Sequence, residues 1–257
     1  SVLKSLLGLV QPEAGTVQVL DLPPDAPAVE VRQRVGYMPE RAAHIPGLNG
    51  YETVMMAGEL TGLPRRDAAR RAHETLYVVG LEEQRYRKGA GYAAGMRQKV
   101  KLARALVHDP AVRCLDEPTN GLDPDSRLTM LQVVGDLAQN LGKSVVLSTH
   151  ILEDVERICD AVVLMEQGQV VASGSLEELT RAEVQALQLE ADGDPAAVDQ
   201  ALRDVGFRAV APGMSPGMWR IEVAAEMPHS EVFRAVGRAG GYVRRLKEER
   251  RKLEDVV

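Results

Sequence analysis

The chain has 257 residues, a formal net charge of −6 at pH 7 and two cysteines, and 45% of its residues are hydrophobic. This length and composition suit an α/β domain with a smaller companion, and two cysteines are too few for a disulfide framework. The acidic balance argues against broad nucleic-acid binding, and no apolar run approaches the roughly 18 residues that a membrane-spanning helix needs.

The first hundred residues begin with a short helix and two short strands, and a long helical region follows. Apolar residues at helical spacing predict a helix over residues 2–10, and alternating patterns predict strands over 15–20 and 34–38. Residues 50–108 then hold three helical stretches separated by breaks that contain Gly and Pro. We therefore expect an all-helical insert after the second strand.

Strands and helices alternate regularly after this insert. Strands are predicted over 112–115, 144–148 and 161–165, with helices near 124–140 and 151–159 between them. Such alternation implies a mostly parallel sheet that helices cover on both faces, and hence an α/β fold.

The pattern changes again from about residue 186. Strands are predicted over 188–190, 207–211, 218–223 and 242–246, with helices starting at 194 and 228 between them. The order strand, helix, strand, strand, helix, strand is typical of a small α+β ferredoxin-like domain. We place the boundary between the two domains within residues 174–185.

Acidic residues and one histidine follow two of the predicted parallel strands. Residues 114–123 read Cys-Leu-Asp-Glu-Pro-Thr-Asn-Gly-Leu-Asp, and the strand over 144–148 runs into Thr149 and His150. Nucleotide hydrolysis needs a carboxylate on the metal, a second one facing the attacking water, and a donor near the terminal phosphate. We expect Asp116, Glu117 and His150 to converge around one terminal phosphate at a common end of the sheet.

The string over residues 115–124 resembles the Walker B motif and D-loop of ATP-binding cassette (ABC) ATPases, which have a P-loop NTPase-like fold. The resemblance implies ATP and Mg²⁺ as cofactors. It assigns Asp116 to the magnesium shell and Glu117 to polarising the water. His150 resembles the switch histidine that contacts the γ-phosphate, and Asp123 would couple the two sites of a dimer.

Glu40 occupies the position of another family element. Residues 37–40 lie where the family has its Q-loop, whose glutamine contacts the metal and the water. A carboxylate ligates magnesium as well as an amide does, so the resemblance implies a nucleotide- and metal-binding role for Glu40. The alternative is an acidic residue in an ordinary turn after a strand.

Residues 92–98 resemble the ABC signature loop, which opens a helix. Ala93, Ala94, Gly95 and Met96 would present free N–H groups and the positive end of the helix dipole to a phosphate on the opposing subunit. Ala93 lacks the hydroxyl that the family uses here, and losing one such bond costs roughly 1–3 kcal/mol. We therefore expect weakened turnover.

Residues 3–15 resemble the helix that follows the phosphate-binding (Walker A) loop, which places the loop's lysine upstream of Ser1. Losing that lysine and three backbone donors removes on the order of 6–12 kcal/mol. A site of micromolar to millimolar affinity is worth only about 4–8 kcal/mol. We therefore expect that these 257 residues alone do not bind ATP measurably and are inactive, whereas the intact gene product binds ATP.

The resemblance covers nearly the whole chain. Residues 1–175 resemble an ABC ATPase domain without its N-terminal strands and Walker A loop, with the helical insert at about 50–108, and residues 186–257 resemble the accessory domain of some ABC-2-type exporter ATPases. The implied protein hydrolyses ATP on the cytoplasmic face of the cell membrane, as a peripheral subunit that drives export. Its implied partners are a transmembrane permease and a second ATPase subunit in a head-to-tail dimer, and no nucleic acid.

Two other functions remain open. A non-hydrolysing regulatory ABC subunit is favoured by Ala93, by Glu40 and by Arg113, a charge in a predicted buried strand. A soluble ABC ATPase acting on nucleic acid or ribosomes is the weaker alternative, because this chain has one cassette, no heptads and an acidic balance.

Overall fold

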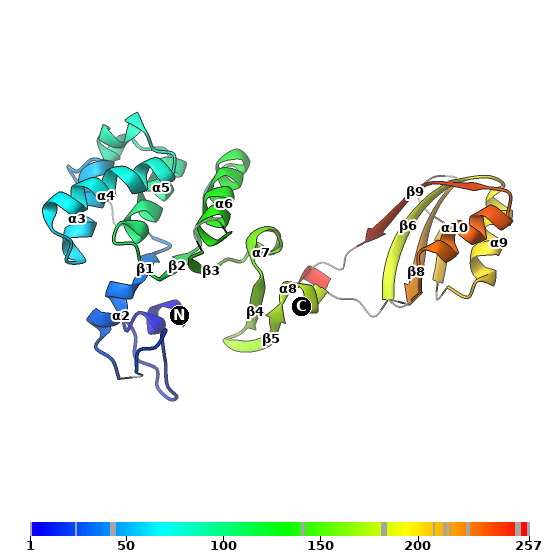
Figure 1. Ribbon diagram of the computed structural model, residues 1–257, viewed down its shortest axis with the longest axis horizontal. Coiled ribbons are helices and arrows are strands. Elements are labelled where there is room, and N and C mark those ends of the chain that lie inside the picture. The colour runs from blue at the N-terminus through cyan, green and yellow to red at the C-terminus, as the bar shows by residue number, and fades with distance from the viewer. Residues whose placement is uncertain are drawn as a thin grey trace. The chain divides into compact units, whose positions relative to one another are not determined.

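The computed structural model divides into two compact units, Ser1–Ile158 and Cys159–Val257 (Figure 1). It describes residues 2–23, 25–41, 45–139, 142–180, 184–207, 209–212, 215, 217–224, 227–249 and 253–255. Within these ranges, no helix combines the length and the apolar character needed to cross a membrane. The division falls after Ile158, whereas the sequence predicts a boundary within 174–185.

A three-stranded parallel sheet forms the centre of the first unit. Its strands are β1 (Val35–Met38), β2 (Val112–Asp116) and β3 (Ser144–Ser148), in the order β1-β2-β3. The register places Met38 beside Leu115 and Asp116 beside Ser148. Because the strands are parallel, their carboxyl ends share one edge, which we call the carboxyl edge. This arrangement confirms the predicted strands over 34–38, 112–115 and 144–148.

Helices cover both faces of this sheet, as the alternation predicts. One face packs against α1 (Val2–Leu6) and α2 (Ala28–Arg34), through a cluster that includes Leu3, Val31 and Cys114. The other face carries Met38, Leu115 and Leu147 and packs against the helical insert and α6 (Pro124–Gln139). The last helix of this unit is α7 (Leu152–Ile158).

The insert is all-helical, which confirms the prediction. It consists of α3 (Gly50–Leu60), α4 (Arg65–Val78), the 3₁₀ turns η1 (Glu83–Tyr86) and η2 (Gly89–Gly91), and α5 (Ala94–Leu106). A capping box between Asn49 and Glu52 starts α3. The buried hydroxyl of Tyr92 accepts a bond from the N–H of Gly50 at 3.0 Å, which ties the start of α3 to the residues just before α5.

Two predicted strands differ from expectation. Residues 15–20 form no strand, because no described strand pairs with residues 16–19, and positive φ values of 86° at Gly15 and 56° at Leu20 bound this short segment. The strand predicted over 161–165 exists as β4 (Ala161–Glu166), but it pairs antiparallel with β5 (Gln169–Ser175) in a separate two-stranded sheet. Its burial alternates, which suits a hairpin with one exposed face rather than a strand buried on both faces.

Arg113 is buried in the centre of the sheet, with 3% of its side chain exposed. Its Nη2 lies 3.4 Å from Oδ1 of Asp109, while Nε and Nη1 have no hydrogen-bond partner among the described residues. Burial lowers the pKa of Arg113, and the charge of Asp109 opposes this shift. The structure thus supplies one ionic partner for a charge that the strand pattern does not accommodate.

The second unit ends in an antiparallel α+β domain (Figure 1). After α8 (Leu176–Thr180), its elements are β6 (Val184–Asp192), α9 (Pro195–Asp204), β7 (Ala209–Pro212), β8 (Met218–Ala224), α10 (Ser230–Arg238) and β9 (Tyr242–Glu249), followed by η3 (Leu253–Asp255). The sheet order is β7-β8-β6-β9, and both long helices join one apolar cluster with Leu187, Leu189 and Ile221. The βαββαβ order confirms the ferredoxin-like prediction.

Candidate active site

Asp116 ends β2 at the centre of the carboxyl edge, and two hydroxyls hold its carboxylate. Oγ of Ser148, on β3, donates to Oδ1 at 2.6 Å, and Oη of Tyr37, on β1, donates to Oδ2 at 3.1 Å. Burial, followed by the charge of Asp116, raises the pKa of Tyr37 to about 12, so this hydroxyl stays a donor at neutral pH. All three strands therefore fix the direction of one carboxylate.

Glu117 follows Asp116 in a backbone conformation that is uncommon for its residue type. Its φ is 49°, and its N–H donates to the carbonyl of Ser148 at 3.0 Å. A left-handed glutamate is strained by roughly 1–3 kcal/mol, and such residues concentrate at functional sites. Its Oε1 lies 3.0 Å from Nδ1 of His150, while the buried Oε2 has no hydrogen-bond partner within the described part of the chain.

His150 meets Glu117 from the segment after β3. Its side chain is 70% exposed, and the hydrogen bond to Glu117, followed by the charge of Glu117, raises the pKa of His150. The Nδ1 contact with Glu117 leaves Nε2 for a second partner. The structure therefore brings Asp116, Glu117 and His150 together, as the sequence predicts.

Replacing Glu117 by glutamine should lower the pKa of His150 toward its ordinary value, because the substitution removes the carboxylate that favours the imidazolium. The pH dependence follows: the charged pair stabilises the fold below the pKa that His150 has in the unfolded chain, and this contribution is lost as pH rises through the raised folded-state pKa. A nuclear magnetic resonance (NMR) titration of the His150 ring measures the shift. Glu153→Gln should leave the pKa of His150 unchanged, and an unchanged pKa in Glu117→Gln would contradict the assignment.

Lys101 and Glu40 connect the helical insert to the carboxyl edge. Lys101, on α5, is buried, and its Nζ donates to the main-chain carbonyl of Glu40 at 2.7 Å. Burial lowers the pKa of Lys101, and the charges of Glu40 and Asp116 oppose this. The Glu40 side chain is exposed, and its charge contributes to the raised pKa of His150 and of Tyr37. Glu40 therefore lies within electrostatic reach of the carboxyl edge.

Ala93 to Met96 lie at the start of α5, beside the segment that follows Glu117. Ala93 is the N-cap and makes no side-chain cap bond. A Cβ on Gly95 would be 3.2 Å from Oγ of Ser126, and Nε2 of Gln98 donates to the carbonyl of Asn120 at 3.0 Å. Among the described contacts, none joins Ala93, Ala94, Gly95 or Met96 to Asp116, Glu117 or His150. The described neighbour of this loop is thus Ser126, in the first turn of α6, rather than a residue of the carboxyl edge.

Asp123 caps the first turn of α6. Its Oδ1 accepts a hydrogen bond from the N–H of Ser126 at 3.0 Å, and this bond lowers the pKa of Asp123. Asp123 therefore lies on the same side of the unit as Gly95, because both residues approach Ser126.

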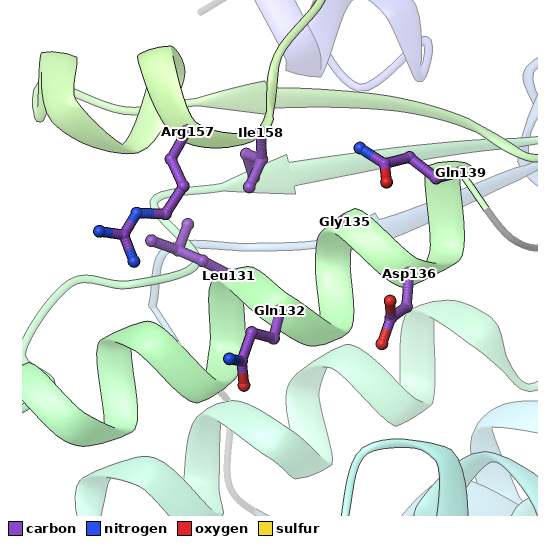
Figure 2. Close-up of a pocket in the computed structure, with 7 residues that line it drawn as sticks. All are labelled: Leu131, Gln132, Gly135, Asp136, Gln139, Arg157 and Ile158. Atoms are coloured by element: carbon purple, nitrogen blue, oxygen red, sulfur yellow. The ribbon is translucent and has the colours of Figure 1, made fainter.

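A pocket of about 450 Å³ lies between α6 and α7 (Figure 2). Its lining residues are Leu131, Gln132, Gly135, Asp136, Gln139, Arg157 and Ile158. None of the residues predicted to act in the site lines this pocket. The candidate active site is therefore the open carboxyl edge rather than this pocket.

The sequence pattern does not identify Tyr37, Ser148 and Lys101 as residues of the site. Tyr37 and Asp116 are 79 positions apart, so only the strand pairing brings them together. Lys101 carried a weak signal, because it interrupts the apolar residues of α5. Ser148 was placed at the end of its strand, but its bond to Asp116 depends on the register between β2 and β3.

The donor set fits a magnesium ion that arrives with a phosphate group. Magnesium is usually bound by one or two carboxylates, waters and substrate phosphates rather than by a cage of protein ligands. Over the described ranges, no group of three or more His, Cys, Asp and Glu side chains is arranged to hold a metal. Asp116, oriented by two hydroxyls, suits such a shared site, and the partnerless Oε2 of Glu117 is available to a water beside it.

Comparison with known proteins identifies similar sequences. A family profile described as "ABC transporter" matches residues 1–120. The chain is 36% identical over 177 residues to an uncharacterized ABC transporter ATP-binding protein, YxlF, of Bacillus subtilis, covering 69% of this chain and 58% of that protein. It is 35% identical over 201 residues to the Nod factor export ATP-binding protein I of Burkholderia lata, and this match covers 78% of this chain and 66% of that protein. The chain thus spans less than two thirds of the length of these relatives.

Solved structures show the same fold. An ATP-binding subunit of an ABC transporter has a TM-score of 0.60 and 29% identity, and the match covers 69% of this chain and 74% of that one. A dimeric ATP-binding cassette in a post-hydrolysis state, bound to ADP and Pi, has a TM-score of 0.60 and 26% identity. This match covers 68% of this chain and 79% of that one.

Proposed function

This chain belongs to the ABC transporter family of ATP-binding proteins, and we propose that it is a subunit that hydrolyses ATP to drive export through a partner membrane permease. The observation that carries the proposal is the 3.0 Å contact between Glu117 and His150, next to a carboxylate that two hydroxyls hold in place. These groups are of the kinds that phosphoryl transfer to water requires.

Each residue of the carboxyl edge has a distinct proposed role. Asp116 holds Mg²⁺, which neutralises charge on the phosphates when it is bound. Glu117 orients and polarises the attacking water through Oε2, the oxygen that His150 does not contact. His150 donates from Nε2 to the γ-phosphate, and its raised pKa favours the charged, donating form. Glu40 contacts the metal or the water from the end of β1.

The second half of the nucleotide site comes from another ATPase subunit in a head-to-tail dimer. Ala93, Ala94, Gly95 and Met96 face the γ-phosphate on the opposing subunit, and Asp123 couples the two sites. The position of this loop beside Ser126, with no described contact to Asp116, Glu117 or His150, supports this arrangement, as does the dimeric form of one similar structure. The start of α5 offers the positive end of a helix of 13 residues to an anion.

The partner is a transmembrane permease, and the protein acts at the cytoplasmic face of the membrane as a peripheral subunit of the ABC-2-type exporter branch. The name of the Nod factor export relative supports an export function. The net charge of −6 supports the exclusion of nucleic acid as a partner.

A non-hydrolysing regulatory subunit is the second candidate, and Ala93 favours it. Ala93 is an N-cap without a side-chain hydroxyl, so it cannot donate to a γ-phosphate as the family's serine does.

Phosphate release by the full-length protein, with and without Mg²⁺, tests the main proposal. We expect steady ATP hydrolysis that chelation of Mg²⁺ abolishes, because the proposed mechanism needs the metal to neutralise the phosphates. ATP binding without hydrolysis, in the presence of Mg²⁺ and the permease, would favour the regulatory function. If the protein neither binds nor hydrolyses ATP, both candidate functions are contradicted.

A further inference from the structure

Asp154, on α7, is a buried carboxylate whose two oxygens have separate partners. Oγ1 of Thr119 donates to Oδ2 at 2.7 Å, and Nε of Arg127 donates to Oδ1 at 2.7 Å. Asp154 and Thr119 are only 1% and 2% exposed. A charged side chain is this deeply buried only where it is paired and hydrogen-bonded, so the surrounding structure is built to hold this group.

The three residues come from three segments of the proposed site. Thr119 lies between Glu117 and Asp123, and Arg127 lies in the first turns of α6, which Asp123 caps. Asp154 lies four residues after His150, and its own N–H donates to the carbonyl of Ile151 at 3.0 Å. One carboxylate therefore ties the segment that carries Asp123 to the segment that carries His150.

We propose that Asp154 is a positioning residue that makes the His150 segment and the Thr119–Asp123 segment move as one unit. The inference rests on the proposed function, in which His150 contacts the γ-phosphate of its own subunit and Asp123 faces the other subunit. A displacement of Asp123 on dimer closure is then transmitted through Thr119 and Asp154 to His150. The arrangement couples the geometry of one ATP site to the state of the other.

The strength of the contact distinguishes Asp154 from its neighbour Glu153. Oε2 of Glu153 also approaches Arg127, at 3.5 Å, but its side chain is 70% exposed. Exposed ion pairs contribute little, whereas a buried carboxylate that accepts bonds from a hydroxyl and a guanidinium is strongly oriented. The charge of Asp154 also contributes to the raised pKa of His150, whereas Glu153 does not. Glu153 is therefore a matched control on the same helix.

The test uses Thr119→Val in the full-length protein, because valine keeps the shape of threonine and the ion pair between Asp154 and Arg127 but removes the hydroxyl. We expect kcat for ATP to fall about tenfold, with KM within about twofold of wild type, since the loss acts on geometry and not on ATP binding. Thr119→Ser should restore kcat, and Glu153→Gln should leave it unchanged. A wild-type kcat in Thr119→Val, or an equal loss in Glu153→Gln, would overturn the proposal.

A second readout separates this inference from the proposed function. NMR signals of the His150 ring and of the Asp123 amide should both shift in Thr119→Val. Neither signal should shift in Glu153→Gln. If wild-type protein does not hydrolyse ATP, the proposed function fails, and these signals still decide whether the two segments are coupled. A shift at Asp123 without one at His150 would overturn the coupling. Thermal unfolding of each variant verifies that it is folded.

Discussion

Replacing Glu117 by glutamine in the full-length protein should lower the rate of ATP hydrolysis by roughly 100-fold or more, the usual contribution of a positioned general base. Glutamine keeps the size of the side chain and an oxygen acceptor but loses the negative charge that polarises the water. The affinity for ATP should remain close to that of wild type, because the partnerless Oε2 is assigned to the water and not to the nucleotide. Phosphate release at saturating MgATP and calorimetric ATP binding measure the two quantities.

Glu153→Gln provides the control for Glu117→Gln, because it removes a nearby exposed carboxylate with no contact to His150. This control should retain the wild-type rate. Indistinguishable rates for Glu117→Gln and wild type would favour the non-hydrolysing regulatory subunit.

Replacing Gly36 by alanine should destabilise the first unit by roughly 3 kcal/mol, at the upper end of the usual cost of overpacking. A Cβ at Gly36, on β1, would lie 2.0 Å from the carbonyl oxygen of Ala105 and 2.8 Å from Cγ of Pro110. The closer neighbour is helix backbone, so α5 itself must move. That movement would also disturb the contact between Lys101 and Glu40 that connects α5 to the carboxyl edge.

Gly135→Ala is the matched control, because a Cβ at this position on α6 would meet only Cγ2 of Ile158, at 3.8 Å. Alanine in a helix interior should stabilise the unit by roughly 0.5–1 kcal/mol. Urea unfolding followed by far-ultraviolet circular dichroism measures both variants. Trp219, the single tryptophan, lies in the second unit, so its fluorescence serves as an internal reference. Gly36→Ala with wild-type stability would show that α5 accommodates the methyl group.

Local signals determined the helical insert and the C-terminal domain. The capping box at Asn49 and Glu52 and the breaks containing Gly and Pro are short-range features, so they mark helix ends without knowledge of the fold. In the C-terminal domain, alternation buries Trp219, Ile221 and Val223 on one face of β8, and the observed strand obeys it.

The sequence pattern does not determine which strands pair with one another. The alternation of Ala161–Glu166 is the same whether the strand joins a parallel sheet or a hairpin, and only its partner distinguishes the two. The signal that was missed is the pair Gln167 and Gly168, whose φ values of 49° and 83° make the two-residue turn to β5. Residues 15–20 alternate too, but no described strand pairs with them.

By itself, the sequence determined which residues stand at the carboxyl edge. Asp116, Glu117 and His150 follow strands, and parallel strands must end together, so chain order was enough to group them. Only the tertiary structure decided how these groups are held. The bonds from Tyr37 and Ser148 to Asp116, from Lys101 to Glu40, and from Thr119 and Arg127 to Asp154 join residues that are between 27 and 79 positions apart. Spacing along a chain carries no information about such contacts, because they depend on strand register and helix packing.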